Sequence, residues 1–255
     1  ECRGCGWVPH CVNCDVSLTY HKAHNQLVCH YCGYTYRLPQ VCPECKGTEF
    51  KMQGFGTEKV EEEIAGQFPA VKVERLDFDT ARTRTAYERI ISDFEKGKTQ
   101  ILIGTQMLSK GLDFGNVSVV GILSADSLMN FPDFRAHERA YQLMVQVSGR
   151  AGRRDKRGTV ILQTTQPEHP LIRMVQHFAY KEMVSLQLSE RSMFRYPPYY
   201  RLIVLILRSR NEEALQEMSA LYAEKLRARL GERVLGPVTP PITRVQTLHI
   251  KKIVL

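Results

Sequence analysis

The spacing of hydrophobic residues predicts an alternation of strands and helices after residue 57. Short apolar runs are typical of strands buried on both faces, and apolar residues recurring every three or four positions are typical of helices with one buried face. We predict strands over 71–76, 100–103, 117–123 and 158–163. The predicted helices cover 57–68, 86–96, 135–147 and 171–180, with a helical continuation through 191. This order indicates a parallel, doubly wound α/β sheet, in which ligands bind at the carboxyl ends of the strands.

Residues at the helix ends refine these boundaries. Thr57 is expected to cap the first helix, whose apolar face is Val60, Ile64 and Phe68, and Pro69 ends it. The helix over 86–96 carries its own apolar face of Ile90, Ile91 and Phe94.

A different pattern follows the rigid segment Tyr196-Pro197-Pro198-Tyr199. The run 202–207 predicts a buried strand, 212–230 an amphipathic helix with leucines at 215, 221, 226 and 230, and Val245 onward a final strand. We expect a small α+β domain. The run 202–207 is also the longest purely apolar one and far too short to span a membrane.

All eight cysteines lie in the first 45 residues, as four Cys-x-x-Cys pairs, and they indicate two zinc sites. Four thiolates make a tetrahedral structural site, and metal binding supplies the folding free energy of a segment with few large apolar residues. A disulfide framework is the alternative, but no signal peptide precedes the pairs and regular two-residue spacings suit metal better. His10, His21, His24 and His30 are expected at the surface because eight thiolates fill both sites.

Spacing favours a nested pairing of the cysteines, although sequential and crossed pairings stay open. Fourteen residues separate the second pair from the third, close to the span of one four-cysteine site. The outer site is then Cys2, Cys5, Cys42 and Cys45, and the inner site is Cys11, Cys14, Cys29 and Cys32.

Composition divides the chain into three parts, with a junction at Gly54 and Gly56. We predict a zinc-binding region over 1–53, an α/β lobe over 54–190 and the α+β domain over 191–255. The chain starts at Glu1 without a methionine and stops inside a predicted strand, so we expect a fragment of a longer protein. Thiolate pairs and the lack of a membrane span indicate a soluble protein of a reducing compartment.

The net charge of +8 permits nucleic-acid binding without proving it. Two tetrathiolate zinc sites lower the net charge to about +4, since each carries a charge of about −2. Five basic residues cluster within eight positions: Arg150, Arg153, Arg154, Lys156 and Arg157. For the last three of these residues, a solvated turn is an equally good interpretation.

The segment Gln146-Val147-Ser148-Gly149-Arg150-Ala151-Gly152-Arg153 fits the Q-x-x-G-R-x-G-R pattern of superfamily 2 helicases. Small residues allow a tight turn that directs two arginines at one point. Two guanidinium groups suit the charge that develops during γ-phosphoryl transfer. The alternative is a glycine-rich helix end with exposed arginines.

A second segment, Gly104-Thr105-Gln106-Met107 with Lys110-Gly111-Leu112-Asp113-Phe114, follows a predicted strand and resembles helicase motif V. An ordinary loop is the alternative. The resemblance implies that Thr105 and Lys110 reach DNA phosphates, whereas Gly111 and Asp113 hold the turn and line the nucleotide cleft.

The order of these features resembles the PriA family of bacterial primosomal helicases, which restart stalled replication forks. Further residues match the family pattern: Arg75, Asp77, Asp79-Thr80, Asp126, Pro132 through Arg139, Gln163-Thr164 and Pro167 through Pro170. The resemblance weakens after about residue 200, where Leu248-His249 replaces a Tyr-Arg common in the family, and this departure puts a DNA-contact role of Arg244 in doubt.

The resemblance implies a RecA-like second helicase lobe that carries an inserted double-zinc region. Arg153 would be the arginine finger, Arg150 a γ-phosphate contact and Gln146 a coupling residue. ATP with Mg²⁺ would bind between this lobe and a first lobe that carries the Walker A lysine. No G-x-x-x-x-G-K-[ST] pattern occurs in the 255 residues, so the fragment alone should not hydrolyse ATP.

The same resemblance implies a cytoplasmic, nucleoid-associated 3′-to-5′ DNA helicase with several partners. These are forked or branched DNA, single-stranded DNA-binding protein, other primosome proteins and the machinery that loads the replicative helicase. No membrane partner is expected. Two alternatives stay open: a non-catalytic double-zinc scaffold with a degenerate helicase-like lobe, and an RNA helicase or restriction-type translocase, which shares both lobe motifs.

Overall fold

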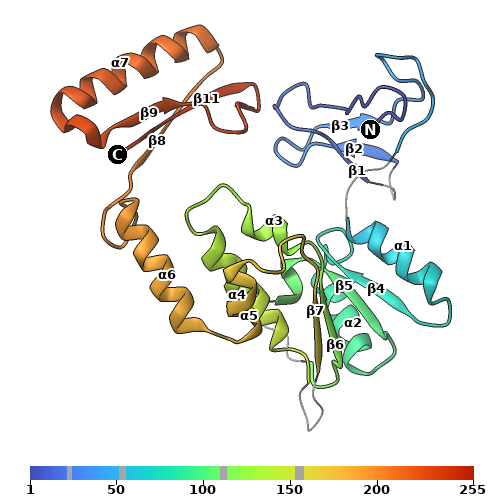
Figure 1. Ribbon diagram of the computed structural model, residues 1–255. Coiled ribbons are helices and arrows are strands. Elements are labelled where there is room, and N and C mark those ends of the chain that lie inside the picture. The colour runs from blue at the N-terminus through green and yellow to red at the C-terminus, as the bar shows by residue number, and fades with distance from the viewer. Residues whose placement is uncertain (22–24, 52–55, 110–113, 153–157) are drawn as a thin grey trace. The chain divides into compact units, whose positions relative to one another are not determined.

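The computed structural model describes residues 1–21, 25–51, 56–109, 114–152 and 158–255 (Figure 1). The chain divides into two compact units. One unit is Gly54–Tyr196, and the other joins Glu1–Gln53 to Pro197–Leu255. The three-part division of the sequence stays a prediction.

Two parallel strand pairs form the frame of the unit Gly54–Tyr196. β4 (Val73–Leu76) pairs with β5 (Ile101–Gly104), and β6 (Val119–Ile122) pairs with β7 (Thr159–Leu162). The helix α2 (Arg84–Glu95) connects β4 to β5, while α3 (Ala125–Met129) and α4 (Ala136–Ser148) connect β6 to β7. Parallel strands require such crossovers, and the α/β fold class is confirmed. The expected burial of the strands on both faces was wrong, because Val119 in β6 and Ile161 in β7 are 56% and 60% exposed.

Two hydrophobic clusters fill this unit. One lies between α2 and the pair β4–β5, where Phe94 meets the buried Phe114 edge to face at 4.8 Å between ring centroids. The other is shared by α3, α4, α5 (Pro170–Gln176) and α6 (Tyr180–Met193). Its buried residues are Ile122, Ala125, Met129, Ala140, Tyr141, Met144, Leu171, Ile172, Met174, Val175 and Met183.

Four expectations about apolar faces and helix ends were wrong. The N-cap of the first helix is Gly56 rather than Thr57, whose hydroxyl instead donates to Asp77. The helix α1 (Thr57–Gln67) has no buried residue, and Phe68 is 51% exposed beyond its end. The helix predicted over 171–180 breaks after Gln176 because Phe178 adopts a left-handed conformation with φ 51°. In α7 (Glu212–Leu230), Leu221 is 42% exposed, and the buried stripe is Leu215, Ser219 and Ala223.

The cysteine-rich region forms a three-stranded antiparallel sheet, ordered β1 (Thr19–His21), β2 (Gln26–Val28) and β3 (Thr35–Arg37). In the described residues of this region, the buried hydrophobic side chains are Leu27 and five cysteines: Cys2, Cys11, Cys14, Cys29 and Cys42. Thiols therefore occupy the positions that aliphatic side chains fill in a larger core.

The segment Pro197–Leu255 forms an antiparallel sheet covered by α7. The central strand β11 (Leu248–Val254) pairs with β8 (Val204–Ser209) and also with β9 (Leu235–Val238) and β10 (Arg244–Val245). A short η3 turn (Gly231–Arg233) follows α7. None of the helices in the described part of the chain is both long and apolar enough to cross a membrane.

Candidate metal centres and motor half-site

The eight cysteines gather into two groups of four. Cys2, Cys5, Cys42 and Cys45 form the outer group, and Cys11, Cys14, Cys29 and Cys32 form the inner group. Within each group the sulfur atoms all lie within 4.8 Å of one another, and all eight cysteines are free. The structure thus has the nested arrangement rather than the sequential, crossed or disulfide-linked ones.

The sulfur positions fit a tetrahedral metal ion. The Sγ–Sγ distances are 3.5 Å for Cys2–Cys45, 3.6 Å for Cys5–Cys42 and 3.6 Å for Cys11–Cys32. A zinc–sulfur bond of about 2.3 Å implies sulfur–sulfur edges of roughly 3.8 Å in a regular tetrahedron. Each group therefore needs only a small adjustment to hold a zinc ion.

Backbone turns present these sulfurs. At Cys2, Cys29 and Cys42, the residue four positions later donates its N–H to the cysteine carbonyl, at 2.8–3.0 Å. Those later residues have positive φ: Gly6 at 77°, Gly33 at 74° and Lys46 at 62°. A left-handed residue is what closes the turn tightly enough to place two sulfurs on one ion.

The inner group contains a thiol that ionises readily. Burial opposes ionisation of Cys11, but hydrogen bonds from the Tyr36 hydroxyl and the Asn13 N–H lower its pKa to about 6. Burial raises the pKa of Cys14 to about 12. A metal ion would have to displace the proton from such a thiol, since thiolates are the ligands.

Histidines do not join either group in the part of the chain that the structure describes. His10 and His30 are exposed and His21 is half-buried, whereas His24 lies outside the described residues.

The predicted motif V begins at the carboxyl end of β5. A Cβ atom at Gly104 would lie 2.6 Å from the Leu108 side chain and 2.7 Å from the Leu76 carbonyl oxygen, so only glycine fits there. Thr105 is exposed immediately after it. The turn η2 (Gln106–Ser109) follows and packs against α4.

The predicted arginine motif lies at the end of α4. Gln146 is exposed on the last turn of this helix, and Arg150 is half-buried just beyond it. The N–H groups of Arg150 and Ala151 donate to Val147 and Ser148, and the Gly152 N–H donates to the Val117 carbonyl at 3.0 Å. These bonds fix the turn to the segment that leads into β6.

Packing of α4 on η2 therefore brings the two predicted motifs onto neighbouring elements. Lys110, Gly111, Asp113 and Arg153 lie outside the described residues, as do Arg154, Lys156 and Arg157.

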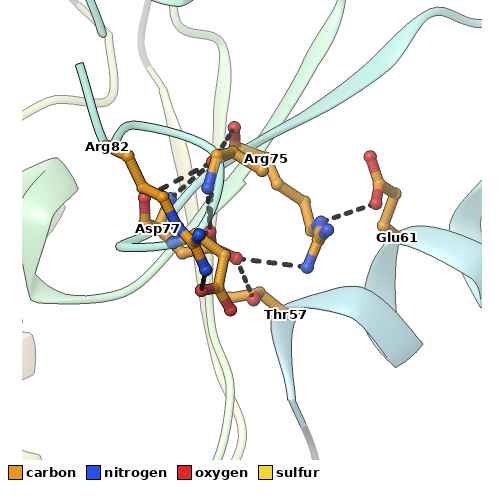
Figure 2. A network of polar contacts seen from close by, with 7 residues as sticks. Thr57, Glu61, Arg75, Asp77 and Arg82 are labelled. Carbon is orange, nitrogen blue, oxygen red and sulfur yellow. Dashed lines mark hydrogen bonds and ion pairs between the residues drawn. The ribbon is translucent and has the colours of Figure 1, made fainter. Parts of the chain in front are cut away.

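A buried carboxylate, that of Asp77, organises the loop after β4 (Figure 2). Asp77 accepts hydrogen bonds from the Thr57 hydroxyl at 2.6 Å, the Thr80 N–H at 2.9 Å and the Asp79 N–H at 3.0 Å. The Arg75 guanidinium lies 3.2 Å from Asp77 and 2.7 Å from Glu61. Although burial opposes ionisation, these donors lower the pKa of Asp77.

The register of the parallel pair places this network at the ligand edge of the sheet. Leu76 pairs with Gly104, so Asp77 and Thr105 leave adjacent strands side by side. In the sequence, Arg75, Asp77 and Asp79-Thr80 stand out only as matches to a family pattern, which predicts no role for them.

Asp126 has the corresponding position between β6 and β7. Its carboxylate accepts the Thr164 hydroxyl at 2.7 Å and the Thr165 N–H at 2.8 Å, and these bonds lower its pKa. Asp126 thus joins the segments that follow β6 and β7, whereas Asp77 joins the loop after β4 to α1.

Comparison with known families accounts for most of the chain. Residues 11–37 match the PriA DNA helicase Cys-rich region (CRR) domain, 48–155 the helicase conserved C-terminal domain, and 192–255 the primosomal protein N C-terminal domain.

Relatives with similar sequences align with nearly the full length of this chain. Replication restart protein PriA of Bacillus subtilis is 44% identical over 96% of this chain, and that of Synechocystis is 42% identical over 96%. The alignments cover 31% and 30% of those proteins, so the chain spans about a third of the curated relatives it matches. Among solved structures, the C-terminal domain of the DEAD-box protein Dbp5 aligns over 48% of this chain and 64% of its own, with 22% identity and a TM-score of 0.36.

Proposed function

Because the chain belongs to the PriA family of replication restart proteins, we propose that it forms the zinc-binding region and second motor lobe of an ATP-dependent 3′-to-5′ DNA helicase. The intact protein would bind stalled replication forks and initiate primosome assembly. The observation that supports the proposal is the packing of α4 on η2, which puts the described parts of the two predicted helicase motifs on neighbouring elements.

Arginines of the motif after α4 would complete an ATP site that a first lobe provides. Arg153 would stabilise the charge developing on the transferred phosphoryl group, and Arg150 would contact the γ-phosphate. The hydrogen bond from Gly152 to Val117 supports this role, because a fixed turn orients guanidinium groups without further loss of freedom.

Coupling to DNA would run through the loop after β5. Thr105 and Lys110 would contact phosphates of the bound strand, and Gly111 and Asp113 would line the nucleotide cleft. Gln146 on α4 would couple the presence of bound nucleotide to the conformation of that loop. The exposure of Thr105 and Gln146 on neighbouring elements is compatible with both contacts.

Both cysteine groups would hold structural zinc. The ion would supply four strong bonds in a region whose buried residues are largely the thiols themselves. The folded region would then contact the fork and a further primosome protein, while the other domains engage single-stranded DNA-binding protein and the helicase-loading machinery.

DNA-stimulated ATP hydrolysis by the intact protein tests the proposal. On a forked substrate, Arg153→Ala should lower turnover by roughly 10³- to 10⁵-fold while fork binding persists. Arg154→Ala is the matched control, since it removes an equal charge one position away. Unchanged strong turnover in Arg153→Ala would remove Arg153 from the arginine-finger role, and absent turnover in both proteins would refute the motor role and favour a zinc-bearing scaffold.

A further inference from the structure

One of the four cysteine turns is not closed in the way that the others are. The residue four positions after Cys11 is Asp15, and its φ is not positive. Its N–H donates to the carbonyl of Arg244 at 2.9 Å, a residue of the segment Pro197–Leu255. The inner turn is therefore completed by a part of the chain more than 200 residues away.

Three further hydrogen bonds join the same two segments. The Gln246 N–H donates to Cys14 Sγ at 3.2 Å, and the Thr247 N–H donates to the Asn13 carbonyl at 2.8 Å. The Thr243 hydroxyl donates to the Asp15 carboxylate at 2.8 Å.

The donors lie on a stiff hairpin. Val245 pairs with Leu248, and the two residues between them have positive φ, 51° for Gln246 and 66° for Thr247. That geometry is typical of a type I′ turn, whose conformation the flanking strands impose. Both turn amides thus face Asn13 and Cys14 in a fixed arrangement.

Apolar packing adds to these bonds. Val245 lies against the buried cluster of Cys11, Cys14 and Cys29. An N–H donor to a metal-bound thiolate stabilises its charge and fixes its orientation, and such partners outside the coordination sphere contribute strongly to metal affinity.

The outer group has its own local support. Its turns at Cys2 and Cys42 are closed by Gly6 and Lys46, and Cys2 forms a β-bridge with Phe50. These contacts all lie within residues 1–51, so the outer group serves as an internal reference.

We infer that zinc at the inner site is thermodynamically coupled to docking of the β10–β11 hairpin, whereas zinc at the outer site is not. This inference rests on the zinc binding proposed above. The hairpin holds the Cys11–Cys14 turn in its metal-binding shape, and by reciprocity the bound metal holds the hairpin.

Site-resolved cysteine alkylation in the intact protein tests the coupling. The protein is exposed to a zinc chelator and an alkylating reagent, and peptide mass spectrometry follows each cysteine separately. Thr243→Val removes the hydroxyl that binds Asp15, and Thr239→Val is the matched control, because its hydroxyl instead accepts from Lys251.

Alkylation of the inner cysteines should be about five- to tenfold faster in Thr243→Val than in wild type. The outer cysteines of Thr243→Val, and both groups in Thr239→Val, should be alkylated at the wild-type rate. Equal acceleration of both groups, or of neither, overturns the coupling. The zinc content of the wild-type protein is measured in parallel. A protein without zinc refutes zinc binding itself, whereas a protein with two zinc ions and uncoupled alkylation refutes only the inference.

Hydrogen exchange measures the reciprocal effect. Cys29→Ser disrupts the inner group and should speed exchange at the Gln246 and Thr247 amides, whereas Cys42→Ser in the outer group should not. Identical exchange at these amides in the two variants contradicts the inference.

Discussion

Replacing Asp77 by alanine tests whether a buried carboxylate holds the loop at the carboxyl end of β4. Asp77 is 7% exposed, and hydrogen-bond donors from four residues converge on it: Thr57, Arg75, Asp79 and Thr80. The substitution leaves those donors without their acceptor while the strand itself is unchanged.

The expected loss of unfolding free energy depends on whether each donor retains another acceptor after the substitution. Removing one partner of a buried ion pair costs about 3–5 kcal/mol. Arg75 keeps Glu61 at 2.7 Å, so its charge is not left alone, and we expect the lower end of that range, about 3 kcal/mol. Asp79→Ala is the control in the same loop: its partner Arg82 is 55% exposed, and exposed pairs contribute about 1 kcal/mol or less.

Native-state hydrogen exchange of peptides from β4 and β5 measures this difference in the intact chain. A loss of about 3 kcal/mol speeds exchange through opening of this region by roughly a hundredfold, and the control changes it by about fivefold at most. If Asp77→Ala and Asp79→Ala change exchange equally, the network does not stabilise the loop.

The contribution of Asp77 to the stability of this loop should decrease at low pH. The pKa of Asp77 is lowered on folding, so its contribution is fully present above the ordinary aspartate pKa of about 3.9 and is lost as the pH falls through the lowered value. The difference in exchange between wild type and Asp77→Ala should therefore shrink below about pH 4.

Substitution, metal removal and salt test three further features of the protein. Gly104→Ala should destabilise the lobe by at least about 1–3 kcal/mol in urea unfolding, because its Cβ would overlap Leu108 and Leu76, while Gly121→Ala, with no atom within 4 Å, should cost less than about 1 kcal/mol. Zinc chelation should change the fluorescence of Trp7, the single tryptophan, without altering exchange in β4 and β5; a parallel change would mean that the two units do not unfold separately. The DNA affinity of the intact protein should fall steeply with salt, and a flat response would exclude phosphate contacts by the basic residues.

Periodicity predicted where the regular elements lie better than how deeply their strands are buried. The strand predicted over 202–207 was expected to be buried, but Val204 and Ile206 in β8 are 43% and 49% exposed. The helix over 212–230 has the predicted ends, and Ile90 is buried as its spacing indicated. The buried face of α7 was predicted incorrectly, because Ser219 and Ala223 are buried rather than the larger Leu221. Small residues allow close helix–sheet approach, which a search for leucines overlooks.

Other features depend on contacts that no local pattern encodes. Phe178 breaks a helix although neither glycine nor proline marks the position. The role of Asp77 needs Thr57, which is 20 residues earlier, and the junction at Asp15 needs Arg244. Cysteine spacing, by contrast, favoured the nested grouping because short turns leave few ways to bring four sulfurs together.

The contact between Cys14 and Gln246 has a consequence for biosynthesis, because the two residues are 232 positions apart. At about 5–20 residues per second, the ribosome needs roughly ten to fifty seconds to make the intervening chain, which includes the whole α/β unit. During that interval the nascent inner turn must await its distant hairpin, while the outer turns can already close locally. Metal insertion during translation should therefore be sequential, with the outer group filled stably first and the inner group secured only after Thr247 leaves the exit tunnel.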